Sequence, residues 1–349
     1  NPEDVIAKGR VGPGQMLVVD TQEGKILHTD DVANYLKKRQ PYAKWVKART
    51  SFVESTLAEE IGALQPLSSD ESEVYMKMFQ VTYEELDQVM RPLAEKGAEG
   101  TGSMGDDTPI AVLSRHVRPL YDYFRQQFAQ VTNPPIDSLR ESIVMSLETR
   151  MGRELNIFEE TEEHADRIIL HSPLLSPNKF WNLKHLNRPG YEAEAISLVY
   201  DPAIGLEQAI RQVVDQAEQA ARAGKLLMFI SERMPEKGQL VINALLATAA
   251  IHYRLSVQGL RCDTNLIVET GSARDAHQIA CLVGYGATAV YPYLSYDAID
   301  RLISTNMIQM GAMEAHKNYR KGINKGLMKI MSKMGISTIS SYRGAQLFE

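Results

Sequence analysis

Cysteine is scarce in this chain of 349 residues, which contains two, Cys262 and Cys281. Two cysteines far apart in sequence exclude the disulfide framework of small secreted domains, and they exclude an iron–sulfur or zinc site built from the cysteines of this chain. Long apolar runs are absent as well. No stretch of eighteen apolar residues occurs, so we expect no membrane-spanning segment.

Positive charge is not in excess either, because the formal net charge is −6. We therefore expect neither nucleic acid nor an anionic membrane as a partner. Residues 1–4 lack the basic and apolar segments of a signal peptide, and the first residue is not methionine. We interpret the chain as a part of a longer cytoplasmic protein. Its length and its 44% of hydrophobic residues are sufficient for a substantial core.

The first 160 residues are predicted to be mostly helical after a short β-hairpin. Residues 16–20 and 25–28 are apolar enough to form two strands, joined through Gly24. Helices are expected from about residue 30, from the capping signature at residues 82–85 as far as residue 97, and over residues 113–129.

From about residue 165 the pattern changes to alternating strands and helices. Units of roughly 30 residues are the size of a β-strand followed by a crossover helix. Apolar runs such as residues 226–231 suit a parallel sheet that is buried on both faces. The pattern predicts an α/β architecture, either a (β/α) barrel or an open doubly wound sheet. The six candidate strands are residues 167–170, 195–200, 226–231, 266–269, 289–293 and 337–341.

A proline elbow occupies residues 130–137, QVTNPPID. Asn133 precedes a proline and is therefore disfavoured in the helical conformation, while Pro134 and Pro135 fix their own φ angles and lack N–H donors. Apolar residues at helical spacing predict a helix over residues 138–149 directly behind the elbow. Such an elbow is either a connection between helices or a rigid loop that holds backbone groups at a functional site.

Two glycine-rich segments are candidates for binding phosphate. Residues 100–105 match G-x-G-x-x-G, but a helix precedes them and two aspartates follow, so we do not expect a nucleotide there. The loop with Gly271, Ser272 and Arg274 is the better candidate for an anion, because it follows a predicted strand and precedes a helix. Ordinary strand–helix turn chemistry, with Ser272 or Asp275 as the helix cap, explains the loop better.

Charged residues also follow two predicted strands. Glu232 and Arg233 end one strand and Glu269 ends another, where barrel enzymes place catalytic groups. Internal ion pairs would place them there just as well. The eight histidines show no metal-binding spacing, and no G-x-S-x-G nucleophile elbow occurs.

Four sequence blocks together resemble one known family. They are residues 8–20 (KGRVGPGQMLVVD), 102–107 (GSMGDD), 130–149, and 333–346, which contain KMGIST and SYRGAQ. In their residues and in their order, these blocks resemble the central domain of the large chain of glutamate synthase. The resemblance extends over essentially the whole chain.

The resemblance implies a degenerate (β/α) barrel-like domain, preceded by a mainly helical region with a short β-hairpin. It also implies four segments. Residues 1–40 would be a junction after an amidotransferase domain, and 41–160 the helical part of the central domain. Residues 161–313 would be its β/α repeat part, and 314–349 a helix and strand leading into an FMN-binding synthase domain.

In that family, ammonia released from glutamine is added to 2-oxoglutarate and the product is reduced to L-glutamate. The resemblance therefore implies a connecting domain that lines an ammonia tunnel, with no catalytic, cofactor or metal residue of its own. FMN and an iron–sulfur cluster would belong to the parent enzyme. The elbow would face the tunnel through Thr132, Asn133, Pro134, Pro135 and Ile136.

The partners implied are the amidotransferase and FMN domains of the same polypeptide, with an NADPH-oxidising small subunit or ferredoxin as electron donor. The location would be the cytoplasm, or a plastid for a ferredoxin-dependent form. The alternative function is an independent flavin- or phosphate-binding barrel enzyme that uses Arg274 and its neighbours. The chain alone is expected to be catalytically inactive in the first case and to bind flavin in the second.

Overall fold

The computed structural model describes residues 2–53, 67–100, 113–127, 135–137, 139–233 and 235–348. The chain forms two compact units. Unit 1 comprises Asn1–Thr50 and Leu155–Arg167, and unit 2 comprises Ser51–Glu154 and Ile168–Glu349.

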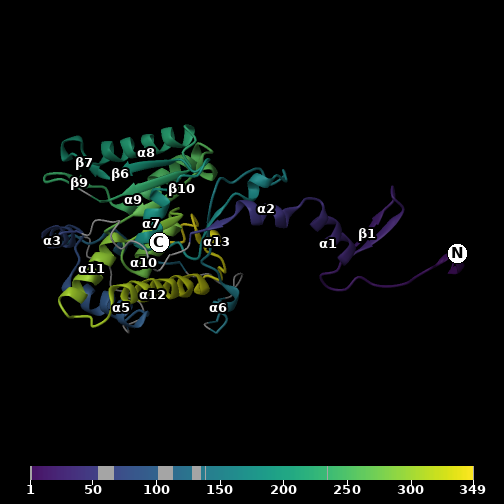
Figure 1. The fold of residues 1–349 in the computed structure, drawn as a ribbon, viewed down its shortest axis with the longest axis horizontal. Coiled ribbons are helices and arrows are strands. Elements are labelled where there is room, and N and C mark those ends of the chain that lie inside the picture. Colours follow the sequence, from purple (N-terminus) through teal and green to yellow (C-terminus); the bar gives the residue numbers. More distant parts are fainter. Residues whose placement is uncertain are drawn as a thin grey trace. The chain divides into compact units, whose positions relative to one another are not determined.

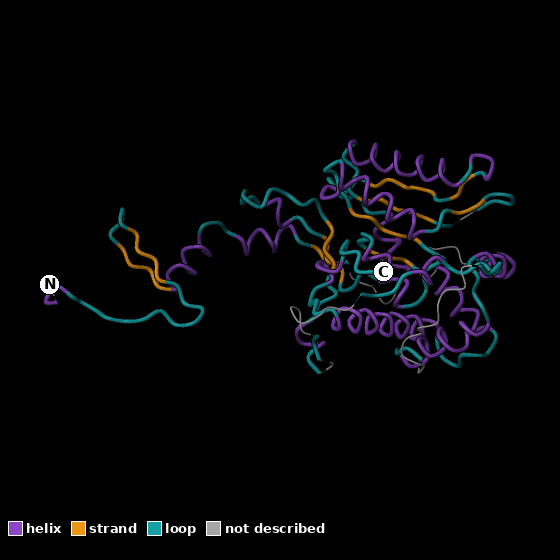
Figure 2. Tube along the Cα trace, turned by 180° about the vertical axis from the view of Figure 1, so that it is seen from behind, coloured by secondary structure: helices purple, strands orange, loops and turns teal. Residues whose placement is uncertain are grey.

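Unit 1 contains the predicted hairpin, which is confirmed (Figure 2). Strands β1 (Leu17–Asp20) and β2 (Lys25–His28) pair antiparallel, and Gly24 takes a positive φ of 64° in the turn. None of the described residues of this unit is buried. The remaining elements are η1 (Pro2–Asp4), α1 (Thr29–Lys38), α2 (Tyr42–Arg49) and η4 (Glu162–Ala165).

Unit 2 is built on a parallel sheet of four strands in the order β11-β10-β8-β6. The strands are β6 (Ala193–Ser197), β8 (Leu227–Ser231), β10 (Asn265–Glu269) and β11 (Ala289–Tyr291). All five residues of β10 and the first four of β8 are buried, as expected of a sheet covered on both faces. The predicted α/β class is confirmed.

The strand order is compatible with a barrel, but the sheet does not close within the described residues. Strands β6, β8, β10 and β11 are neighbours in chain order, and Leu174, which precedes all of them, forms a parallel bridge with Val290 in β11. The earliest segment thus lies beside the last strand, as in a barrel. No pairing among the described residues joins that segment to β6.

Helices connect the strands and pack on one another in sequence. Helix α8 packs on α9, α9 on α10, and α10 on α12 (Figure 1). These helices are α7 (Pro177–Lys184), α8 (Leu206–Arg222), α9 (Ala244–Val257), α10 (Ala276–Gly284), α11 (Tyr293–Ser304) and α12 (Ala312–Lys333), with short turns η5 (Pro202–Ile204) and η6 (Arg261–Asp263).

Two smaller sheets complete the strand inventory of the described residues. In one, β3 (Ser51–Phe52) pairs parallel and β4 (Thr149–Met151) antiparallel with the central strand β5 (Ile168–Leu170). In the other, β7 (Val199–Tyr200) pairs antiparallel with β9 (Leu240–Val241).

The helix predicted after the capping signature at residues 82–85 is confirmed. The Thr82 hydroxyl accepts a hydrogen bond from the Glu85 amide, and helix continues through α4 (Tyr83–Glu85), the π-helical turn η2 (Leu86–Met90) and α5 (Arg91–Lys96). Helix α5 packs closely on α12 because Gly322 has no side chain, since a Cβ there would lie 2.5 Å from Leu93. Helix α3 (Ser69–Met78) precedes them.

Three expected elements differ from the structure. Of residues 113–129, those up to 127 contain one short helix, η3 (Leu120–Tyr123), because Pro119 breaks a helix at that point; the last two lie outside the described residues. The helix over 138–149 is reduced to α6 (Glu141–Val144). The strand over 337–341 is instead α13 (Ile339–Tyr342), preceded by an extended Thr338.

The last two corrections have one physical cause. The Ser146 amide donates to the Ser337 carbonyl at 2.8 Å, and the Ile339 amide donates to the Ser146 carbonyl at 3.0 Å. This pairing between distant segments holds Ser146 extended, so the helix stops before it. Tertiary contacts override the local helical pattern here.

Candidate functional site

The carboxylate of Glu232 lies at the carboxyl ends of the central strands and is fully buried. Its Oε1 accepts hydrogen bonds from the Ala244 amide (2.7 Å) and the Ser272 hydroxyl (2.8 Å). Its Oε2 accepts from the Thr270 hydroxyl (2.6 Å) and from the amides of Gly271 (2.9 Å) and Ser272 (3.1 Å). Burial raises the pKa of Glu232, and the hydrogen bonds from Thr270, Ser272 and Ala244 oppose that effect. They compensate the desolvation of this carboxylate.

The loop after β10 folds so that its amides point at Glu232. The Thr270 hydroxyl accepts hydrogen bonds from the amides of Ser272 and Ala273 at 3.1 and 3.2 Å, which closes a tight turn. Gly271 is required at the turn, because a Cβ there would lie 2.6 Å from the ring of Phe79. The same glycine and hydroxyl residues that suggest an anion site therefore bind a carboxylate of this chain.

Arg274 joins this loop to the helical region that precedes the sheet. Its side chain is 2% exposed and forms a bidentate ion pair with Glu85, with Nε–Oε1 at 2.5 Å and Nη2–Oε2 at 3.0 Å. Its Nη1 donates to the Gly271 carbonyl at 2.8 Å, and its own carbonyl accepts from the Tyr319 hydroxyl at 2.7 Å. Every nitrogen of this guanidinium thus has an acceptor within unit 2.

Glu269 and Arg233 form an internal ion pair at the same edge of the sheet. Their closest N···O distance is 3.4 Å, and Glu269 also accepts a hydrogen bond from the Ser231 hydroxyl at 2.7 Å. The Arg233 guanidinium lies 5.2 Å from the centre of the Tyr293 ring, within range of a cation–π interaction. The structure thus brings Glu232, Arg233 and Glu269 together in a network of internal contacts.

The candidate anion site at Gly271, Ser272 and Arg274 therefore already contains the chain's own carboxylates, from Glu232 and Glu85. Binding of an external anion there stays a prediction. The segment that matches G-x-G-x-x-G is described at Gly100 alone, and the rest of it lies outside the described residues.

The proline elbow is described in part. Thr132, Asn133 and Pro134 lie outside the described residues, Pro135 is exposed, and Ile136 is half-buried. Ile136 packs against the main core, and its amide donates to the Ser332 carbonyl at 2.9 Å, near the end of α12.

The segment after the elbow is attached to the same end of α12 and carries exposed apolar side chains. The Ser332 hydroxyl donates to Glu141 at 2.8 Å, so α6 is held against α12. Leu139, Ile143 and Val144 are nevertheless 85%, 81% and 49% exposed. Exposed apolar side chains that cluster in this way mark surfaces used for contact with another domain or protein.

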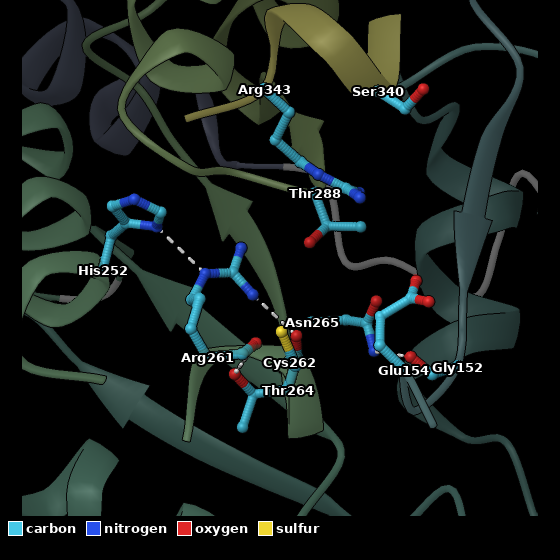
Figure 3. Close-up of a pocket in the computed structure, with 10 residues that line it drawn as sticks. All are labelled: Gly152, Glu154, His252, Arg261, Cys262, Thr264, Asn265, Thr288, Ser340 and Arg343. Carbon is cyan, nitrogen blue, oxygen red and sulfur yellow. Dashed lines mark hydrogen bonds between the residues drawn. The ribbon is translucent and has the colours of Figure 1, made fainter. Parts of the chain in front are cut away.

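A pocket of about 200 Å³ lies at the opposite edge of the sheet, at the amino ends of β10 and β11. Figure 3 shows His252 and Glu154 on opposite sides of it and the guanidinium of Arg343 between them. Its polar lining also includes Arg261, Thr264 and Thr288. The sequence-based predictions include none of these residues, although Arg343 lies in the SYRGAQ motif.

Metal-binding groups do not gather in the described part of the chain. No cluster of three or more histidine, cysteine or acidic side chains suited to a metal ion occurs there. The two cysteines are both free, Cys262 exposed and Cys281 buried. Across the described residues, the structure has no helix whose length and apolar character would let it cross a bilayer.

Comparison with known proteins gives two family matches within the chain. Residues 74–349 match the family described as glutamate synthase central domain, and residues 1–45 match the class-II glutamine amidotransferases. A flavocytochrome b2 variant with sulfite bound is a structural neighbour at 14% identity and a TM-score of 0.34, covering 50% of this chain and 39% of its own. A likeness of that extent supports no conclusion about this chain.

Two relatives have closely similar sequences. The large chain of a glutamate synthase (NADPH) from Bacillus subtilis is 38% identical over 99% of this chain and 22% of its own length. A chloroplastic ferredoxin-dependent glutamate synthase from Oryza sativa subsp. japonica is also 38% identical over 99% of this chain and 22% of its own. The chain thus spans about a fifth of the length of these relatives, and it belongs to the glutamate synthase central domain family.

Proposed function

We propose that this chain connects a glutamine amidotransferase domain to an FMN-binding synthase domain within one glutamate synthase polypeptide. The observation that carries the proposal is the order of the two family matches, amidotransferase first and central domain second, in one chain. The parent enzyme would form L-glutamate from L-glutamine and 2-oxoglutarate. This chain would contribute no catalytic residue and would be inactive alone.

The surface of unit 1 supports contact with the rest of an amidotransferase domain. The hairpin exposes Leu17, Val18, Val19 and Ile26, each at least 40% exposed, on four-residue strands. A two-stranded hairpin of this kind is marginally stable by itself and gains stability when another layer covers its apolar side chains. Because residues 1–45 match the amidotransferase family, that layer would be the remainder of the same domain.

The elbow supports a role as a wall between two active sites. A passage for ammonia needs backbone that excludes water, because free ammonia would otherwise be protonated and escape. We propose that Thr132, Asn133, Pro134, Pro135 and Ile136 line this passage. The fixed positions of Ile136 and α6 on the end of α12, and the exposed apolar side chains of Leu139 and Ile143, are what a segment clamped between domains requires.

The cofactors would lie in other domains of the parent enzyme. The two cysteines of this chain cannot supply the four thiolates of an iron–sulfur cluster. The donor of electrons would be NADPH, through a small subunit, or ferredoxin, as the names of the two relatives indicate for those proteins.

The decisive experiment is Ile136→Trp in the full-length enzyme. A larger side chain should obstruct the passage, so that more glutamine is hydrolysed than glutamate is formed, while synthesis from added ammonium salt continues. Both products are measured in one assay. Ile204→Trp is the matched control, because Ile204 lies in η5 and is 40% exposed. Complete coupling of hydrolysis to synthesis in Ile136→Trp would contradict the proposal.

We do not propose an independent flavin- or phosphate-binding enzyme. The amides of Gly271 and Ser272, which would bind a phosphate, already donate to Glu232, and Arg274 is paired with Glu85. Flavin absorbance that copurifies with this chain would favour that alternative.

A further inference from the structure

The pocket at the amino ends of β10 and β11 is lined by more positive than negative charge. Arg261 and Arg343 are cations, Glu154 is the one carboxylate among the lining residues, and His252 comes from α9. The polar lining also includes the side chains of Thr264, Asn265, Thr288 and Ser340. A pocket with two arginines and hydroxyl groups has the composition of an anion site.

Arg261 is held in place by neutral acceptors. Its Nε donates to His252 Nδ1 at 3.0 Å and its Nη1 to the Thr264 carbonyl at 2.7 Å (Figure 3). Its Nη2 donates to the Gly286 carbonyl at 2.6 Å. None of these partners carries a negative charge. Burial and the nearby Arg343 lower the pKa of Arg261 to about 10, so its charge is stabilised less than in water.

The guanidinium of Arg343 has fewer hydrogen-bond partners than that of Arg261. Arg343 follows α13, and within the described residues no side-chain hydrogen bond or ion pair involves its guanidinium. It is half-buried, and burial lowers its pKa, with Glu154 acting in the opposite direction. A partly buried guanidinium that lacks an acceptor is unfavourable unless something else supplies one.

His252 is fixed as a neutral acceptor at the back of the pocket. A Cβ on Gly286 would lie 2.4 Å from its Nδ1, and one on Gly344 would lie 3.2 Å from its Cε1, so two glycines make room for the ring. Burial and the two arginines lower the pKa of His252 to about 4. At neutral pH it orients Arg261 and adds no charge of its own.

We propose that this pocket binds a small oxyanion, either phosphate or a short dicarboxylate, through the guanidinium groups of Arg343 and Arg261. Arg343 would form the principal ion pair, because its donors are not used within the described residues. Arg261 would contribute charge and His252 would act as its positioning residue. The volume of about 200 Å³ accommodates an anion of this size.

The test is calorimetric titration of the full-length protein with inorganic phosphate and, separately, with succinate. Wild-type protein is compared with Arg343→Gln and Arg343→Lys, so that any anion bound by other domains cancels in the difference. We expect Arg343→Gln to weaken binding of at least one anion by about tenfold or more, and Arg343→Lys to weaken it less, because lysine keeps the charge but not the paired donors.

Arg211→Gln is the matched control, because Arg211 is exposed on α8 and pairs with Glu207. It should leave both titrations unchanged. Phosphate binding that depends on Arg343 would identify a phosphate group as the ligand chemistry, and succinate binding a dicarboxylate. The proposal is overturned if neither anion binds the wild-type protein, or if Arg343→Gln binds both as tightly. Either result would be expected if a carboxylate from another domain already fills the pocket.

Discussion

The two edges of the parallel sheet in unit 2 differ in whether their charged side chains have partners of opposite charge. At the carboxyl ends of β8 and β10, the buried carboxylate of Glu232 receives five hydrogen bonds, and Arg274 is paired with Glu85. At the amino ends of β10 and β11, Arg261 and Arg343 face one pocket, and neither forms an ion pair within the described residues. At the first edge Arg274 is paired with a carboxylate, whereas in the described part of the second edge neither arginine is.

This difference predicts that mutations at the two edges affect different properties, folding stability at the first and ligand binding at the second. Where each buried charge has its partners inside the unit, removing one group leaves the others without acceptors, and the expected effect is on folding. Where a guanidinium such as that of Arg343 has no acceptor within the described residues, its removal costs the fold little, and the expected effect is on a ligand. Barrel enzymes place catalytic groups at the carboxyl edge of the sheet. In this chain the charged groups at that edge bind one another, so position at this edge alone does not indicate a functional site.

The largest expected effect comes from Glu232→Gln. The amide NH2 of glutamine cannot accept hydrogen bonds, so backbone amides that now donate to Glu232 would face another donor. We expect the free energy of unfolding to fall by about 3–5 kcal/mol, measured by urea denaturation.

Glu207→Gln is the control, because its side chain is exposed and pairs with Arg211 on the same helix. A surface pair of this kind contributes at most about 0.5 kcal/mol. Equal stabilities of Glu232→Gln and wild type would show that the carboxyl edge does not depend on this charge.

A smaller effect is expected from Gly286→Ala at the amino edge. The new Cβ would lie 2.4 Å from His252 Nδ1 at a residue whose φ is 109°, so it would displace the ring that orients Arg261. We expect a loss of about 2–3 kcal/mol in unfolding free energy. Gly238→Ala separates clash from backbone strain, because φ there is 94° and a Cβ would meet nothing within 4 Å. It should cost about 1 kcal/mol. Equal losses at both sites would mean that the space around His252 is not restricted.

Local sequence patterns predicted the strands of the main sheet well, for physical reasons. Strands such as β8 and β10 are short runs of consecutive apolar residues. The pattern that predicts each strand is therefore local, and the alternation of strands and helices can be recognised from the sequence. The helix predicted behind the elbow is confirmed only over α6. It ends at Val144 because Ser146 pairs with Ser337, and nothing in residues 138–149 encodes a partner so distant.

The candidate site was predictable in part for the same reason. Glu232 and Gly271 follow strands that are neighbours in a parallel sheet, so their proximity follows from the fold class. Glu85 is 189 residues from Arg274 and comes from a helix outside the repeat pattern, so the pair that occupies Arg274 could not be foreseen. The amino-edge pocket likewise joins residues from five separate segments. Arg343 lies in the SYRGAQ motif, but only the structure places it in the same pocket as His252.

The smallest expected effect is on the pH dependence of stability, and it arises from His252 at the amino edge. In the unfolded chain its pKa is about 6.5, and in the folded chain burial and the two arginines lower the pKa to about 4. Between these values the unfolded state binds a proton that the folded state does not. Stability therefore falls as pH falls from about 6.5 to about 4, and His252 has no effect above that window.

Solvent screening at this partly exposed site reduces the expected contribution to about 2 kcal/mol across the window. Carboxylates titrate over the same range, so the informative quantity is the difference between wild type and His252→Asn, which keeps an acceptor for Arg261 but cannot be protonated. We expect wild type to lose about 2 kcal/mol more than His252→Asn, measured by urea denaturation in a buffer free of phosphate. His116→Asn, at an exposed histidine, should retain the wild-type slope. If His252→Asn also retains it, neither burial nor the two arginines lower the pKa of His252 in the folded protein.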